Sequence, residues 1–114
     1  MTETELKAIW VRYMHRNDLT ADLDTTLELV QSRISERLML SEIDVGAILE
    51  DNPRMFVHGG LCYLAELARD TEQMQLEEQY LAEAIRDYSF RQSIDRLPRP
   101  MASRPYFDGG NDAA

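Results

Sequence analysis

This sequence has few residues that cross-link a fold or break a helix: one cysteine and four prolines in 114 residues. The single cysteine, Cys62, excludes an internal disulfide framework and a zinc site built from several cysteines, and it fits a reducing compartment. No apolar run is long enough to cross a bilayer, and the opening MTETELKAI lacks the features of a signal peptide. We therefore expect one soluble domain with no targeting segment, which buries a hydrophobic core without covalent cross-links.

Basic residues are also scarce relative to acidic ones, and the formal net charge is −9. The imbalance is concentrated in residues 20–52, where only Arg33 and Arg37 oppose eight carboxylates. These are Asp22, Asp24, Glu28, Glu36, Glu42, Asp44, Glu50 and Asp51. An acidic surface repels phosphate, which disfavours a nucleic-acid reader but permits a surface that DNA slides past.

Motifs for catalysis are missing: there is no glycine-rich phosphate loop, no Ser-His-Asp order and no cofactor fingerprint. His58 and Cys62 are four residues apart and share a helical face, but a nucleophile and base also need an orienting group and an oxyanion site. We favour Cys62 as a small buried residue. We expect no enzymatic activity, no catalytic residue and no cofactor.

Two groups of carboxylates raise the question of a metal ion. Those between residues 42 and 51 do not match the calcium loop, which has alternating oxygen ligands, a central glycine and a closing glutamate. Glu77, Glu78 and Glu83 are not accompanied by the Glu-x-x-His spacing of di-metal bundles. We interpret both groups as solvated surface and expect no metal site.

Apolar periodicity predicts two helices in the first forty residues. The first spans about residues 3–15, is capped by Thr2 or Thr4, and places Trp10 in the core rather than on a nucleic-acid stacking platform. The segment RNDLT interrupts the pattern, and Asp18 or Thr20 is expected to start the next helix, over about residues 21–39.

Two further helices are predicted after a connector at residues 40–52, which has at most one or two helical turns. Asn52 as the cap and Pro53 as the first residue start the third helix. Its pair Gly59-Gly60 indicates close approach of a neighbouring helix. The fourth spans about residues 72–96, capped by Asp70 or Thr71, and Pro98 ends it. The fold class is all-α: a bundle of about four helices over residues 1–97.

The remaining residues, 98–114, are predicted to form an extended C-terminal arm. Ordering them costs about 1 kcal/mol of backbone entropy per residue, so the arm needs a partner on which to dock. We expect its apolar and charged side chains to make that contact. They are Arg99, Met101, Arg104, Tyr106 and Phe107.

The segment IWVRYMHRNDL at residues 9–19, followed by DTTLELVQSRISERLM at residues 24–39, resembles the opening of head-to-tail adaptor proteins of tailed bacteriophages. These proteins are also called connector or head-completion proteins. In that family the first two helices meet at a turn of the form HR-x-DL, here residues 15–19. A later pair of helices, here 53–96, and a C-terminal extension complete the resemblance. The chain is short for the family between its second and third helices.

The resemblance implies a structural virion protein of the phage neck, assembled in the host cytoplasm. Such subunits form a ring, commonly a dodecamer, below the portal protein, and they extend the DNA channel toward a tail or nozzle protein. DNA passes without specific binding, and no membrane is involved. On this view the arm contacts the portal or a neighbouring copy, and Met39, Leu40 and Ile48 are exposed for subunit contacts. The alternative is a small helical DNA-binding regulator, suggested by basic and aromatic residues interleaved in KAIWVRYMHR.

Overall fold

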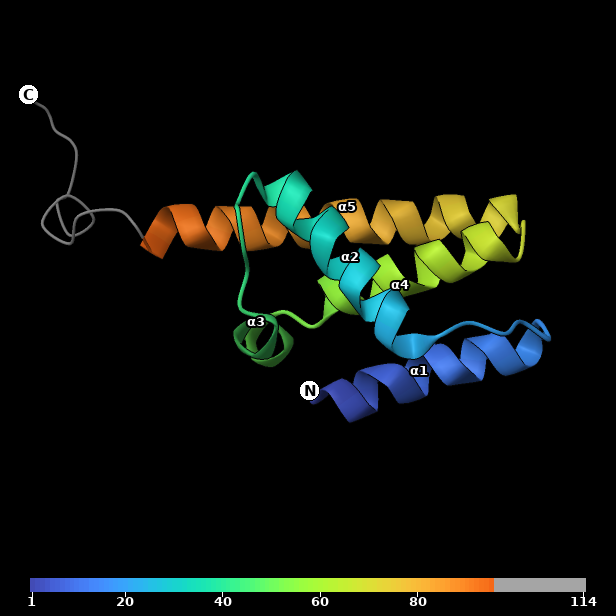
Figure 1. Cartoon of the computed structure of the whole chain (residues 1–114). Helices are drawn as coiled ribbons and strands as arrows, with labels where there is room; N and C mark the ends of the chain where they lie inside the picture. Colours follow the sequence, from blue (N-terminus) through green and yellow to red (C-terminus); the bar gives the residue numbers. More distant parts are fainter. Residues whose placement is uncertain (96–114) are drawn as a thin grey trace, which may run out of the picture.

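The described part of the chain is built from α-helices that pack around one central helix (Figure 1). The computed structural model describes residues 1–95, within which there is no β-strand. The helices are α1 (Glu3–Arg16), α2 (Leu23–Leu38), α3 (Val45–Asp51), α4 (Arg54–Leu67) and α5 (Thr71–Asp95). The predicted all-α class is confirmed. The expected connector contains α3, a helix of seven residues.

The first two helices start where side-chain oxygens accept hydrogen bonds from backbone N–H groups. The Thr2 hydroxyl accepts from the Glu5 N–H, and the Glu5 carboxylate accepts from the Thr2 N–H, so the predicted Thr2 cap is confirmed as a capping box. The prediction that Asp18 or Thr20 starts the second helix is wrong, because Asp22 is the N-cap of α2. The N–H of Asp24 donates to the Asp22 carboxylate at 3.0 Å, and this bond lowers the pKa of Asp22.

Asn52 does not cap α4, contrary to the prediction. It follows α3, is buried, and donates from Nδ2 to the Ala84 carbonyl oxygen of α5 at 3.2 Å. Pro53 therefore occupies the cap position, with no side-chain hydrogen bond, and Arg54 is the first helical residue. Burial explains the difference, since an amide removed from water needs a partner, and α5 provides the carbonyl. At the next boundary the predicted cap is confirmed, because Asp70 accepts from the Gln73 N–H at 3.1 Å.

Helix α4 is the centre of the packing: α5 and α1 run alongside it, and α2 crosses it (Figure 1). Each helix contributes apolar side chains to one core. They are Leu6, Trp10, Val30, Ile34, Ile48, Leu49, Met55, Phe56, Leu64, Leu81 and Ala84. Trp10 is fully buried, as predicted. Ile48 is only 3% exposed, so its predicted role in subunit contacts is wrong, because α3 turns it into the core.

The glycine pair of α4 lies where α1 and α2 approach. A Cβ at Gly60 would lie 2.0 Å from Cε2 of Trp10, and one at Gly59 would lie 2.9 Å from Cγ1 of Val30. The Trp10 ring also donates from Nε1 to the Val57 carbonyl oxygen at 3.4 Å. The predicted close approach is confirmed, with one glycine for each neighbouring helix.

Helix α5 is much longer than the helix it packs against. It has 25 residues and so is about 37 Å long, whereas α4 has 14 residues. Its C-terminal turns therefore extend past α3 and α4 (Figure 1). None of the helices within residues 1–95 is long and apolar enough to span a membrane.

Two glycine-to-alanine substitutions should have opposite effects on stability. Gly60→Ala places a methyl group inside the Trp10 ring, so we expect it to lower the free energy of unfolding by about 3 kcal/mol. Gly46→Ala in α3 meets no side-chain atom closer than 3.5 Å, and it should raise stability by up to about 1 kcal/mol. Urea unfolding followed by circular dichroism measures both, and equal effects would contradict the packing described.

Candidate functional site

The side chains predicted to bind partners, Arg99, Met101, Arg104, Tyr106 and Phe107, lie outside the described residues. Residues 1–95 contain three other places with unusual chemistry. One is a buried carboxylate between α4 and α5. The second is a cavity between α2, α4 and α5, and the third is an exposed apolar end formed by α2 and α5.

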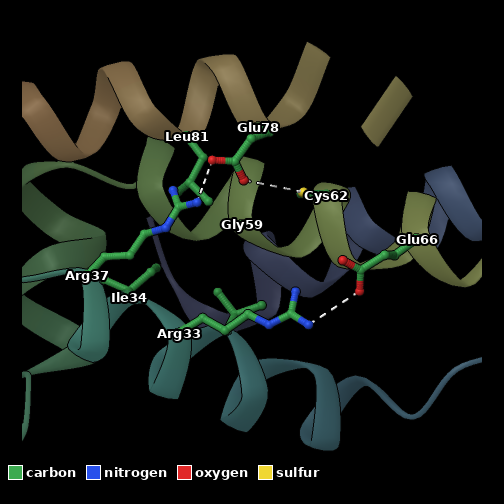
Figure 2. Close-up of a pocket in the computed structure, with 9 residues that line it drawn as sticks. Arg33, Ile34, Arg37, Gly59, Cys62, Glu66, Glu78 and Leu81 are labelled. Carbon is green, nitrogen blue, oxygen red and sulfur yellow. Dashed lines mark hydrogen bonds and ion pairs between the residues drawn. The ribbon is translucent and has the colours of Figure 1, made fainter. Parts of the chain in front are cut away.

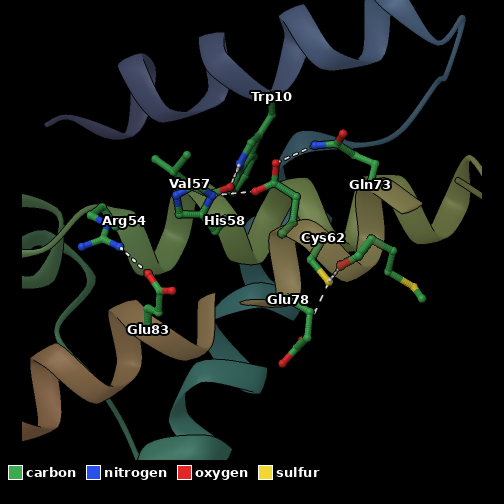
Figure 3. Close-up of polar contacts among 10 residues, drawn as sticks. Trp10, Arg54, Val57, His58, Cys62, Gln73, Glu78 and Glu83 are labelled. Atoms are coloured by element: carbon green, nitrogen blue, oxygen red, sulfur yellow. Dashed lines mark hydrogen bonds and ion pairs between the residues drawn. The ribbon is translucent and has the colours of Figure 1, made fainter. Parts of the chain in front are cut away.

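The buried carboxylate belongs to Glu77, which is only 5% exposed. Figure 3 labels its two hydrogen-bond partners, His58 from α4 and Gln73 from α5. Oε1 of Glu77 lies 2.6 Å from Nδ1 of His58 on α4, and its Oε2 accepts from Nε2 of Gln73 at 2.7 Å. The prediction that Glu77 is solvated is therefore wrong. The signal was present, because Met74, Glu77 and Leu81 follow the spacing of one helical face. A carboxylate on that face is buried and must be hydrogen-bonded.

The charge of Glu77 also acts on a buried hydroxyl of a third helix, that of Tyr13 on α1. Its oxygen is buried and has no hydrogen-bond partner within the described residues. Burial raises the pKa of Tyr13, and the negative charges of Asp70 and Glu77 raise it further. The His58 ring lies against Tyr80, with centroids 5.0 Å apart. The His58 ring is thus in contact with Tyr80, and both carboxylate oxygens of Glu77 have polar partners within the protein.

The structure does not join His58 and Cys62 as a nucleophile and base. His58 faces Glu77, whereas Cys62 lies 3.7 Å from the Met74 carbonyl oxygen and 4.0 Å from Oε1 of Glu78. Cys62 is buried, as predicted. Burial raises its pKa, as do the nearby carboxylates of Glu78 and Glu66. The thiol therefore stays protonated at neutral pH and is a poor nucleophile.

A cavity of about 240 Å³ opens beside Cys62, between α2, α4 and α5 (Figure 2). Its apolar lining comes from Val30, Ile34 and Leu81, together with Gly59. Ion pairs cross its rim, one joining Arg33 to Glu66 at 3.3 Å and the other joining Arg37 to Glu78.

The rim charges of this cavity are compensated in pairs, so they present no net charge to a ligand. Arg33 also lies over the Tyr63 ring, 5.5 Å from its centroid. The four paired side chains are each about two-fifths exposed, so each pair contributes at most about 1 kcal/mol to stability. Across residues 1–95, no group of three or more His, Cys, Asp or Glu side chains is arranged to hold a metal ion. We interpret the cavity as a gap in the packing of α2 against α4 and α5, where the two ion pairs join the helices.

The exposed apolar end is where α2 finishes beside the C-terminal turns of α5. Met39 is 90% exposed and Leu40 is 42% exposed, as predicted for both. A hollow of about 180 Å³ lies between the helices there. Its lining residues are Leu38, Leu40, Tyr88, Ser89, Gln92 and Ser93. Among the described surfaces, this end has the chemistry of a protein contact.

Comparison with known proteins finds no matching family model, curated protein or solved structure. The function must therefore be inferred from the residues of the chain itself.

Removing the Glu77 carboxylate should destabilise the fold. In Glu77→Ala, His58 and Gln73 lose their acceptor inside the protein, so we expect the free energy of unfolding to fall by about 3 kcal/mol. The control is Glu83→Ala on the same helix, which removes an exposed ion pair with Arg54 and should cost less than about 1 kcal/mol. Urea titration measures both. Similar losses would mean that Glu77 is not buried as described.

Cys62 should react slowly in the folded protein. Because the pKa of its thiol is raised and its side chain is buried, we expect alkylation by iodoacetamide at neutral pH to be at least about 10-fold slower than in urea. The rate should keep rising with pH beyond the range in which an unfolded thiol has finished titrating. A fast reaction near neutral pH would show an activated thiol and would contradict the environment described.

Proposed function

We propose that this protein is a non-enzymatic structural subunit of a tailed bacteriophage, a head-to-tail adaptor that forms a ring below the portal. In this role it extends the DNA channel and joins it to the tail or nozzle. The observation that carries the proposal is the turn at residues 15–19, which has the HR-x-DL form of that family and lies between the first two helices.

The conformation of this turn gives a physical reason for Asp18 and Leu19. Asp18 has a left-handed φ of 51°, which aspartate tolerates better than most residues. The Leu19 N–H donates to the Met14 carbonyl oxygen at 2.9 Å, and the Asp18 N–H donates to that of His15 at 3.4 Å. This is the Schellman pattern, and Leu19 packs against the core beyond it. The turn directs the chain from α1 toward α2.

The charge distribution supports a DNA channel more than a DNA reader. Exposed carboxylates of α2 and the segment before α4 repel phosphate, so DNA can pass without being held. The regulator alternative depended on basic and aromatic residues acting together on α1. Trp10 is buried, however, and Lys7 is paired with Asp24 at 2.7 Å, so neither is available for bases and phosphates.

The finer parts of the proposal extend the same idea. The helices of residues 1–97 form the body, and residues 98–114 form an arm that contacts the portal or a neighbouring copy through Arg99, Met101, Arg104, Tyr106 and Phe107. The ring is proposed to be a dodecamer in the phage neck, assembled in the host cytoplasm.

A particle assay tests this function. A phage lacking the gene should produce filled heads without attached tails, as seen by electron microscopy, and the full chain supplied in trans should restore infectious particles. A chain lacking residues 98–114 should keep its helical circular dichroism but fail to restore attachment, because the portal contact is lost.

Two outcomes would contradict the proposal. One is normal particles in the absence of the gene. The other is tight, sequence-specific binding in a gel shift at moderate salt, which would favour the regulator instead.

A further inference from the structure

One face of α5 keeps large apolar side chains in contact with solvent. Seven large apolar side chains are exposed within residues 1–95, and three of them, Leu76, Tyr80 and Phe90, belong to this helix. Glu83 and Asp87 share their face, because the steps along the five positions are four, three, four and three residues. All five residues are exposed. We call Leu76, Tyr80, Glu83, Asp87 and Phe90 the α5 seam.

The spacing of the seam indicates what shape of occupant fits it. Leu76 and Phe90, at its two ends, are separated by about 21 Å along the helix axis. Alternating steps of four and three residues are the repeat of a left-handed coiled coil, in which the side chains of one helix insert between those of a second helix. A second helix can therefore follow the seam along its whole length, with its own apolar side chains between those of α5.

The middle of the seam is acidic. Glu83 and Asp87 share one guanidinium, that of Arg54 on α4, at 3.9 Å and 3.5 Å. One guanidinium compensates only one of the two negative charges. The charged residues one turn before each end of the seam, Glu72 and Arg86, are opposite in sign and leave this balance unchanged. A lysine or arginine of an occupant would compensate the remaining charge, whereas a carboxylate at that place would be repelled.

The same charges disfavour a second copy of this chain as the occupant. In an antiparallel pair of seams with Leu76 of one copy level with Phe90 of the other, Glu83 of one copy would face Glu83 of the second copy. Parallel pairing in register would also place Glu83 against Glu83. Like charges at the centre of both arrangements oppose self-pairing and favour a partner that carries positive charge there.

From this pattern we infer that the α5 seam binds a basic amphipathic helix of a different protein. Apolar side chains of that helix pack against Leu76, Tyr80 and Phe90, and a lysine or arginine between them lies over Glu83 and Asp87. This inference goes beyond the proposed function, because it concerns one face of α5 and depends neither on residues 98–114 nor on a ring.

Two matched synthetic peptides test the charge of the partner. Both are fluorescently labelled helices with leucine at the outer heptad positions and alanine and glutamine elsewhere, and they differ only in carrying lysine or glutamate at the central heptad positions. Anisotropy titration with the full chain should show that the lysine peptide binds at least about 10-fold more tightly than the glutamate peptide. Added salt should reduce this difference, because the carboxylates of the seam are exposed.

Charge reversal within the seam is the decisive measurement. Glu83→Lys with Asp87→Lys should reverse the preference, so that the glutamate peptide binds more tightly than the lysine peptide. The matched control is Glu28→Lys with Glu36→Lys on α2, which changes the net charge by the same amount. Both control residues are exposed and form no ion pair within the described residues, so the preference for lysine should remain.

Truncating Phe90 tests the apolar part of the contact. Phe90→Ala should weaken binding of the lysine peptide roughly 10-fold. Its control is Met39→Ala, which removes another exposed apolar side chain, at the end of α2, and should leave the affinity unchanged. Circular dichroism checks that each variant is folded. Tyr80 is kept in all variants, because its ring lies against His58.

Several outcomes would overturn the inference: no binding of the lysine peptide up to about 1 mM, equal binding of both peptides, or a preference that survives reversal of the seam. Self-association of the wild type that is lost in Phe90→Ala would assign the seam to a second copy instead. The particle assay measures the adaptor role separately, so either proposal can fail without the other.

Discussion

The contact between Trp10 and Gly60 is the constraint on which the rest of the structure depends. An indole ring can lie against the backbone of α4 only because position 60 has no side chain, and Gly59 gives Val30 of α2 similar access. Helices α1 and α2 are thereby held through the same short stretch of α4. The energetic cost of two glycines inside a helix is offset by the large apolar area that Trp10 buries.

The alignment of α5 along α4 depends on polar contacts instead. Asn52 donates to the Ala84 carbonyl oxygen, His58 meets Glu77, and Cys62 lies near the Met74 carbonyl oxygen. Residue numbers rise along one helix as they fall along the other, so these contacts mark successive levels of one antiparallel pair. Apolar packing tolerates small slips along the axis, whereas buried hydrogen bonds do not. The polar contacts therefore select one register for a helix that extends well beyond its partner.

The surface separates into parts with different chemistry. Acidic side chains cover α2 and the segment before α4, whereas the exposed apolar side chains Met39 and Leu40 lie where α2 ends. A ring subunit around DNA needs both kinds of surface, because the channel must not hold phosphate and neighbouring copies must hold one another. In the proposed adaptor role, the acidic surface meets the first of these two requirements.

Helix positions were determined by the sequence itself, because apolar spacing, caps and glycines act over a few residues. The cap at Thr2, one of two predicted alternatives, the burial of Trp10 and the close approach at Gly59-Gly60 were all predicted in this way. The resemblance to adaptor proteins also came from the sequence, and the function based on it stays a proposal. Only the tertiary structure decided the roles of Glu77 and Asn52, which local pattern placed in solvent and at a helix cap. The physical reason is that burial of a polar group depends on which helix packs over it, and that partner lies far away in the sequence.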